Sequence, residues 1–285
     1  MKKPIGIFDS GIGGLTVVEQ LMHLLPNEQL IYFGDTARIP YGTKSKRLIE
    51  RYAVEDAKFL LQYDIKALVV ACNTASSLAM DVLLNSLDVP VIGVVIPGAE
   101  AAVKLTCNNK IGVIGTIATI NSKSYTLQIQ KRLSEAQVFG QACPLLVPLV
   151  EEGWLDDEVT ILTLKKYLPE MIKEQVDTLI LGCTHYPLLE KTIQKIMGDH
   201  VRLIDSGKET AKAVKQVLIE NNLINRSDKP GPDKFFVSDI PMKFEEIGSR
   251  FLGKTLDNVE RVDFERFLVK LEPGRMNNLR SNIEV

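Results

Sequence analysis

The chain has 285 residues, of which 45% are hydrophobic and 25% are charged, and its formal net charge is −2. This composition is typical of a soluble globular protein, and the length is sufficient for two compact domains. The near balance of charges argues against a nucleic-acid-binding protein, and the lack of a long apolar run argues against a membrane-spanning one.

Short apolar segments alternate with amphipathic segments along most of the chain. The segments predicted as strands are Ile5–Phe8, Leu30–Gly34, Ala67–Ala71, Val91–Val94, Ile111–Gly115, Leu179–Gly182, Val201–Ile204 and Lys234–Val237. The segments predicted as helices include Lys46–Gln62, Thr74–Leu87, Asn121–Leu133, Asp157–Glu174, Leu188–Met197 and Glu209–Asn221. Strands made almost entirely of Val, Ile and Leu are buried on both faces, as in parallel sheets covered by helices. The sequence therefore predicts an α/β fold with mainly parallel sheets.

Two local strings occur twice. Phe8-Asp9-Ser10-Gly11 is similar to Ile204-Asp205-Ser206-Gly207, and LVVACNTASS (68–77) is similar to LILGCTHYPL (179–188). In the second pair, a buried strand leads into a cysteine, then a threonine, then the start of a helix. The two cysteines are separated by about one domain's length of chain. This indicates two similar domains that each contribute one cysteine, although a strand followed by a small residue and a helix also recurs by chance.

Cys72 and Cys183 each follow a predicted strand and precede a predicted helix. Ligands bind at the carboxyl ends of parallel strands, and a helix N-terminus stabilises a thiolate. Two matched thiols suit a reaction that takes place on both faces of a substrate. The alternative is that a cysteine is a small buried hydrophobic residue, and this reading is favoured for Cys107 and Cys143, which have no matching partner.

The chain has only four cysteines and three histidines, and they show no zinc-ligand spacing. We therefore expect no metal site. The N-terminus enters a predicted strand directly and has no signal-peptide pattern. Free thiols and a cytoplasmic location are the resulting expectations.

Asp9 and Ser10 follow the first predicted strand, and Gly11, Gly13 and Gly14 come directly after them. Glycines let the backbone approach a ligand at the start of a helix. The spacing of a dinucleotide-binding loop and the Lys of a P-loop are both absent, and Asp9 would repel a phosphate. Asp9 fits better as a partner for an ammonium group or as a proton relay, with helix capping as the alternative.

Tyr41 and Gly42 lie in a loop after the second predicted strand, where backbone N–H groups could bind a carboxylate. A plain turn is the alternative. Thr116 and Thr119 follow Gly115 at a predicted strand end, and their hydroxyls could bind an anion or cap a helix.

Thr184 and His185 directly follow Cys183, and a histidine so close to a thiol can assist proton transfer. Glu151 and Glu152 form an acidic pair after an apolar run. Their role stays open, and a solvated helix end is the alternative to a catalytic one.

The sequence resembles the glutamate racemases of bacterial cell-wall synthesis from about Ile5 to about Phe267. The matching strings are IGIFDSGIGGLTV (5–17), YFGDTARIPYG (32–42), ACNTAS (71–76), IGVIGTIATINS (111–122), VPLVEEG (147–153), LGCTHYPLL (181–189) and LIDSG (203–207). The combination of ACNTAS with GCTHYP is the most specific part of this resemblance.

The resemblance implies two α/β domains related by pseudo-twofold symmetry, with the active site in the cleft between them. The first domain would comprise residues 1–97 and 208–267, the second would comprise residues 98–207, and residues 268–285 would form a polar tail. It implies neither pyridoxal phosphate nor metal, so that no cofactor is expected. The expected partners are glutamate as substrate and a second copy of the chain in a homodimer.

The resemblance also implies residue roles. Cys72 and Cys183 match the catalytic pair, with Cys72 acting on the D-enantiomer and Cys183 on the L-enantiomer. Asp9, His185 and a glutamate, preferably Glu151, match the supporting acid–base groups. Substrate-binding segments are matched by Asp9-Ser10, Tyr41-Gly42, Asn73-Thr74 and Thr184-His185.

The expected function is the interconversion of L- and D-glutamate at Cα, which supplies D-glutamate for peptidoglycan. One alternative is a racemase for another amino acid such as aspartate, whose enzymes resemble this chain but carry Glu in place of His185. Another is a non-catalytic regulatory protein on the same scaffold.

Overall fold

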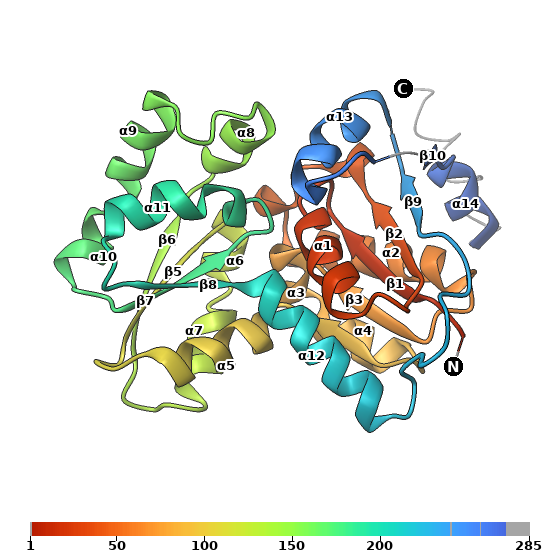
Figure 1. Cartoon of the computed structure of the whole chain (residues 1–285), viewed down its shortest axis with the longest axis horizontal. Helices are drawn as coiled ribbons and strands as arrows, with labels where there is room; N and C mark the ends of the chain where they lie inside the picture. Colours follow the sequence, from red (N-terminus) through yellow and green to blue (C-terminus); the bar gives the residue numbers. More distant parts are fainter. Residues whose placement is uncertain (1, 240, 257, 272–285) are drawn as a thin grey trace, which may run out of the picture.

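The computed structural model describes residues 2–239, 241–256 and 258–271, which form two parallel sheets that lie side by side (Figure 1). The first sheet has the strand order β10-β9-β2-β1-β3-β4. Its strands are β1 (Ile5–Asp9), β2 (Leu30–Gly34), β3 (Ala67–Val70), β4 (Val91–Gly93), β9 (Lys234–Val237) and β10 (Val259–Arg261). Every pairing in this sheet is parallel, as the apolar strands predict.

The second sheet is also parallel and has the order β6-β5-β7-β8. Its strands are β5 (Lys110–Gly115), β6 (Gln137–Ala142), β7 (Thr178–Gly182) and β8 (Arg202–Asp205). The eight predicted strands are all present, and each end either coincides with the prediction or differs from it by one residue. The sequence missed β6 and β10, because β6 is a half-exposed edge strand with polar residues and β10 is very short.

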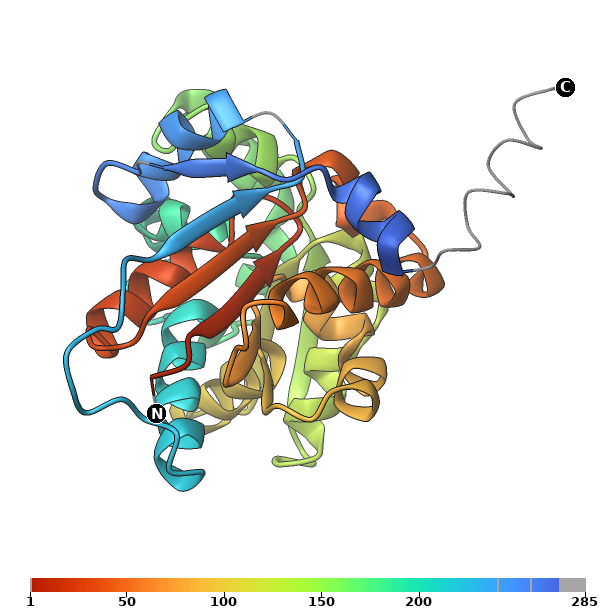
Figure 2. The ribbon, with the colours of Figure 1, turned by 90° about the vertical axis from the view of Figure 1, so that its right-hand side faces the viewer.

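Helices cover both faces of the first sheet (Figure 2). On one face lie α1 (Leu15–Leu24), α12 (Ser206–Glu220) and α13 (Pro241–Leu252). On the other lie α2 (Lys46–Leu61), α3 (Asn73–Leu78), α4 (Met80–Ser86) and α14 (Phe264–Leu271). Two short 3₁₀ turns, η1 (Thr36–Arg38) and η2 (Tyr41–Thr43), follow β2. The α/β class predicted from the apolar strands is confirmed.

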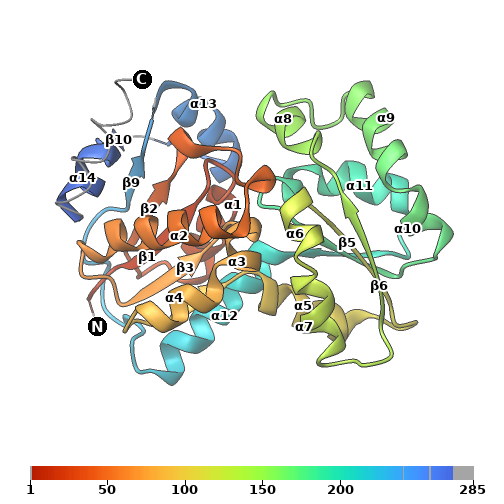
Figure 3. The same ribbon diagram turned by 180° about the vertical axis from the view of Figure 1, so that it is seen from behind.

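The second sheet is covered in the same way (Figure 3). One face packs against α5 (Val95–Leu105) and α7 (Ser124–Gln130). The other carries α8 (Leu146–Glu151), α9 (Glu158–Tyr167), α10 (Pro169–Lys173) and α11 (Glu190–Met197), whose buried side chains join the core of the first sheet. The short helices α6 (Ile117–Asn121) and η3 (Tyr186–Leu189) follow the ends of β5 and β7.

Two of the predicted helices are interrupted. The segment Asp157–Glu174 divides into α9 and α10, because Pro169 has no N–H to continue the helix and its ring clashes with the preceding turn. The segment Thr74–Leu87 divides at Ala79 into α3 and α4. Asp205 starts α12 by accepting hydrogen bonds from the N–H groups of Gly207 and Lys208.

The chain passes from the second sheet back to the first through α12, which contacts both α1 and α5. The predicted domain boundaries at residues 97 and 208 stay predictions. Residues 268–271, which the sequence assigns to a polar tail, continue α14, and Leu268 packs against the core there. Residues 272–285 of that tail lie outside the described residues. No helix in the described ranges combines the length and apolar character needed to cross a membrane.

Candidate active site

A cavity of about 430 Å³ lies at the carboxyl ends of strands from both sheets. Residues that follow β1, β3, β5 and β7 line it, as expected for open parallel sheets. The predicted site residues that line this cavity are Ser10, Tyr41, Gly42, Cys72, Asn73, Thr74, Thr116, Glu151, Cys183, Thr184 and His185. Asp9 and Thr119 are not among the lining residues. The two cysteines therefore face one cavity from two different sheets.

The glycines after β1 allow this turn to approach the turn that carries Cys183. A Cβ atom on Gly13 would lie 2.2 Å from Thr184 Oγ1 and 2.5 Å from His185 Nδ1. Thr16 also donates a hydrogen bond to the Thr184 carbonyl oxygen at 3.0 Å. Gly13 therefore permits close packing between two protein turns, whereas the sequence had suggested a close approach to a ligand.

Cys72 is buried in an environment that favours the neutral thiol. Its Sγ caps α3, accepting from the Ala75 N–H at 3.5 Å, and donates to Ser10 Oγ at 3.6 Å. Burial and the nearby Asp9 carboxylate raise the pKa of Cys72 to about 12. At neutral pH the free protein therefore holds a proton on this sulfur.

Asp9 is fully buried at the end of β1, behind the residues that line the cavity. Its Oδ2 accepts from the Gly11 N–H at 2.9 Å, and its Oδ1 has no hydrogen-bond partner among the described residues. Burial raises the pKa of Asp9, whereas the positive charge of His185 opposes that rise. Asp9 therefore lies near the thiol of Cys72 as a carboxyl group that is ready to hold a proton.

Cys183 has the opposite electrostatic environment. Its Sγ is 3.9 Å from Nδ1 of His185, and Nε2 of His185 is 2.9 Å from Oε1 of Glu151. Burial lowers the pKa of His185, but its hydrogen bonds with Cys183 and Glu151 outweigh that effect and raise the pKa to about 10. The protonated imidazole therefore places a positive charge beside the sulfur of Cys183. Of the two glutamates that the sequence left open, Glu151 is the one that contacts His185.

Three threonines form a chain of hydroxyl groups beside the cavity. Thr116 Oγ1 is 2.9 Å from Thr74 Oγ1 and 2.9 Å from Thr119 Oγ1. Thr119 is buried and contacts Thr116 rather than the cavity. The structure therefore places Thr116 and Thr74 at the cavity, with Thr119 as their support.

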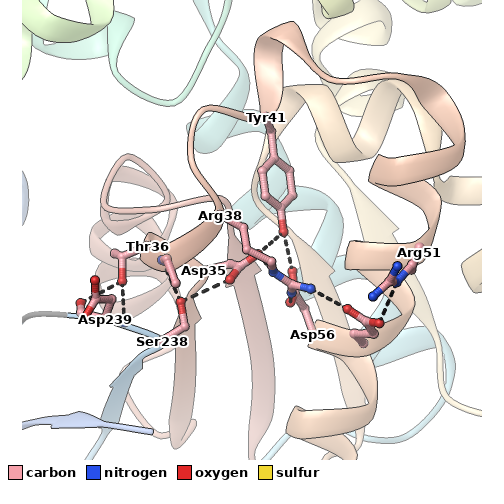
Figure 4. Close-up of polar contacts among 10 residues, drawn as sticks. Asp35, Thr36, Arg38, Tyr41, Arg51, Asp56, Ser238 and Asp239 are labelled. Atoms are coloured by element: carbon pink, nitrogen blue, oxygen red, sulfur yellow. Dashed lines mark hydrogen bonds and ion pairs between the residues drawn. The ribbon is translucent and has the colours of Figure 1, made fainter. Parts of the chain in front are cut away.

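Tyr41 lines the cavity, but its hydroxyl contacts two buried carboxyl groups (Figure 4). That hydroxyl donates to Asp35 and lies 2.9 Å from Asp56 Oδ2. Arg38 donates to Asp35 Oδ2 at 2.6 Å and to Asp56 Oδ1 at 2.7 Å. Burial raises the pKa of both carboxyl groups, although Arg38 opposes that rise. The side chain of Tyr41 therefore anchors the loop, which leaves the Tyr41-Gly42 backbone as the part available to a ligand.

The cavity also contains lining residues that the sequence did not single out. These are Ile12, Thr36, Ile39, Pro40, Val147, Pro148, Asp239, Phe244 and Ile247. Thr36, Ile39 and Pro40 lie in the same loop as Tyr41, within the matching string YFGDTARIPYG (32–42). Their place in that string was the available sign that they line the site. Asp239, Phe244 and Ile247 come from the segment after β9, and no local pattern marks them. Among the described residues, no group of three or more His, Cys, Asp or Glu is placed to hold a metal ion.

Comparison with known proteins agrees with this architecture. Residues 13–214 match the Asp/Glu/hydantoin racemase family. A glutamate racemase from Geobacter metallireducens is 50% identical over 263 residues, which covers 92% of this chain and 97% of the relative.

Solved structures give the same relationship. The crystal structure of glutamate racemase from Francisella tularensis in complex with D-glutamate has a TM-score of 0.87 at 43% identity, covering 93% of this chain and 99% of that one. A glutamate racemase isoform from Bacillus anthracis has a TM-score of 0.88 at 42% identity, covering 92% and 98% respectively. With two thiols at one cavity and these relatives across most of its length, the chain belongs to the Asp/Glu/hydantoin racemase family.

Proposed function

We propose that this chain is a glutamate racemase in which Cys72 and Cys183 act as two opposed bases. The observation that carries the proposal is that the two thiols, one from each sheet, line a single cavity. Relatives named as glutamate racemases, about 50% identical over most of the chain, support glutamate as the substrate.

Racemisation requires a base on one face of Cα and an acid on the other. In the L-to-D direction, the Cys183 thiolate removes the α-proton, and the electron pair of the broken C–H bond stays on the substrate as a carbanion. The Cys72 thiol then donates its proton to the opposite face of Cα. The product leaves with Cys183 as the thiol and Cys72 as the thiolate, which is the form required for the reverse reaction.

The remaining residues bind the substrate and stabilise the charge that develops on it. The lining residues Tyr41, Gly42, Asn73, Thr74 and Thr184 carry backbone N–H, amide and hydroxyl groups that can serve as donors. Such donors stabilise a carbanion that is delocalised into the α-carboxylate, since preorganised dipoles need no rearrangement during the reaction. His185 and Asp9 act on the thiols, each beside a different sulfur.

The other readings of the sequence make different predictions. An aspartate racemase would act on a substrate that is one methylene shorter. Because this chain has His185 where aspartate racemases carry a Glu residue, glutamate is favoured over aspartate as the substrate. A non-catalytic regulator would show no turnover with either amino acid. Supply of D-glutamate for peptidoglycan, a cytoplasmic location and a homodimer are further parts of this proposal.

Circular dichroism of D- and L-glutamate incubated with the purified protein tests the function directly. We expect both enantiomers to reach the same equal mixture, and we expect the activity to survive dialysis against a chelator and treatment with a carbonyl-trapping reagent. Loss of activity that zinc or pyridoxal phosphate restores would contradict the cofactor-free proposal.

Deuterated water distinguishes two bases from one. With two thiols, deuterium should enter mainly the newly formed enantiomer at early times, because its proton comes from the opposite sulfur. Equal early deuterium in substrate and product would contradict the two-base mechanism.

A further inference from the structure

Tyr125 lies between the two turns of the chain that carry the cysteines. It belongs to α7, and its side chain is buried. Its hydroxyl donates to Oδ1 of Asn73, which directly follows Cys72, at 2.7 Å. Its ring packs against Gly182, which directly precedes Cys183: a Cβ atom there would lie 3.3 Å from Tyr125 Cε2. One side chain therefore contacts both cysteine turns.

The contact with Tyr125 determines which end of the Asn73 amide is available to a ligand. Asn73 lines the cavity and is 2% exposed. Its Oδ1 is engaged by Tyr125, whereas its Nδ2 has no hydrogen-bond partner among the described residues. A buried N–H group without a partner is unfavourable and is normally satisfied in a folded protein. The free group is a donor, which matches an anionic oxygen.

We propose that Tyr125 is a positioning residue, which holds the Asn73 amide with its NH₂ group toward a carboxylate oxygen of the bound amino acid. The proposal rests on the proposed function for the identity of that ligand. Without the Tyr125 hydroxyl, the amide can turn over and present Oδ1 instead of Nδ2. An oxygen in that position repels a carboxylate, so the affinity for the substrate falls.

A neighbouring contact supplies a matched control. The short helix α3 lies against α6 and α7 (Figure 3), and Ser124 Oγ donates to Ser77 Oγ at 2.8 Å across that contact. Ser124→Ala therefore removes a hydrogen bond between the same two helices and leaves the Asn73 amide held. Any effect of Tyr125→Phe that comes only from loosening α3 against α7 should also appear in Ser124→Ala.

The kinetic test compares Tyr125→Phe, Ser124→Ala, Asn73→Ala and the double variant of Tyr125 and Asn73. Tyr125→Phe should raise the KM of both enantiomers roughly tenfold, with a smaller change in kcat. The reason is that the Asn73 NH₂ group is no longer held toward the substrate carboxylate, so its hydrogen bond to that charged group is lost. Ser124→Ala should keep a KM close to that of the wild type. Once Asn73 is alanine, removing the Tyr125 hydroxyl should add no further effect. A wild-type KM in Tyr125→Phe, or the same rise in Ser124→Ala, would overturn the proposal.

A second measurement does not depend on the reaction. In the ligand-free protein labelled with ¹⁵N-asparagine, the side-chain signal of Asn73 is identified by its loss in Asn73→Ala. That signal should shift in Tyr125→Phe and stay in place in Ser124→Ala. An unchanged signal in Tyr125→Phe would overturn the positioning role even in an active racemase. If the wild type does not racemise glutamate, the proposed function fails, whereas this signal still decides whether Tyr125 orients the amide.

Discussion

The two halves of the cavity carry the same reactive group in opposite environments. Cys72 shares its surroundings with the buried carboxyl group of Asp9, which favours the neutral thiol. Cys183 lies beside His185, whose pKa of about 10 keeps the imidazole protonated at neutral pH. One half of the site therefore places a buried carboxyl group near sulfur, and the other places a protonated imidazole near sulfur.

This difference teaches that similar local sequences can serve complementary roles. A reaction that inverts one carbon needs an acid and a base at the same moment, so two identical environments would be unsuitable. The assignment of the L-enantiomer to Cys183 and of the D-enantiomer to Cys72, which the family resemblance implies, stays a prediction. Because the two enantiomers have equal free energy, any change in kcat/KM that a variant causes must be the same in both directions. Asymmetry between the halves therefore appears in kcat and in isotope exchange.

The largest expected effect comes from removing either thiol. Cys72→Ser and Cys183→Ser should each lower kcat/KM by about 10³-fold or more, because a serine hydroxyl is a far weaker acid than a thiol. Each variant should still exchange the α-hydrogen of the enantiomer that faces its remaining thiol, which NMR in deuterated water would detect. Cys107→Ser, at an exposed position, is the control. Wild-type turnover in either catalytic variant would refute the two-thiol mechanism.

A smaller loss is expected when the charge beside Cys183 is removed. His185→Gln should lower kcat/KM by about 10²-fold, since the thiolate loses its cationic partner.

Glu151→Gln should move the alkaline limb of the pH–rate profile to lower pH, because the hydrogen bond that helps raise the pKa of His185 is weakened. Glu152→Gln is the matched control. The same alkaline limb in Glu151→Gln and the wild type would show that Glu151 does not tune His185.

The raised pKa of His185 also has a consequence for stability. Its folded-state pKa of about 10 lies above the ordinary value of 6.5, so its stabilising effect is fully present below about pH 6.5. That effect is lost as the pH rises through about 10. Denaturant unfolding of the wild type and His185→Gln across this range should show the two free energies of unfolding converging at high pH.

Asp9→Asn should lower turnover less than His185→Gln does, and it should stabilise the folded protein at neutral pH. Loss of the carboxyl group beside Cys72 should lower turnover about tenfold in at least one direction. Burial raises the pKa of Asp9, so the stability that it contributes is present below its ordinary pKa of 3.8 and is lost as the pH rises through the folded-state value. A neutral amide avoids this loss, and Tm at pH 7 should rise by about 2 °C or more. Wild-type rates with a lower Tm would show that Asp9 is only a structural cap.

The smallest effect on activity is expected outside the thiol pair. Tyr41→Phe removes the hydroxyl between Asp35 and Asp56 and should lower the free energy of unfolding by about 1–2 kcal/mol. We expect kcat/KM to stay within about threefold of the wild type, since the backbone rather than the hydroxyl is available to the ligand. Urea unfolding and initial rates check both parts. A loss of activity as large as that of Asp9→Asn would show that the Tyr41 hydroxyl also contributes to catalysis.

The sequence by itself determined the fold class and the positions of the reactive groups. Apolar strands in a row predict buried parallel sheets, and Cys72 and Cys183 stand at the junction between a strand and a helix. These features are local, because hydrophobic periodicity and the residue at a strand end are read within a few positions of the chain. The resemblance then added Asn73 and gave the preference for Glu151 over Glu152, because the local patterns around these residues are ambiguous.

Only the tertiary structure decided which partners each group has. Tyr125 meets Asn73, and Asp35 meets Ser238 at 3.0 Å, although each pair is distant in the sequence. Phe244 reaches the cavity from a segment with no distinguishing pattern. Hydrogen bonds and pKa shifts depend on atoms that come together across the two sheets, and burial arises only when the chain is packed. That is why two similar cysteine motifs acquired neighbours of different charge, Asp9 near Cys72 and His185 beside Cys183, which neither motif encodes on its own.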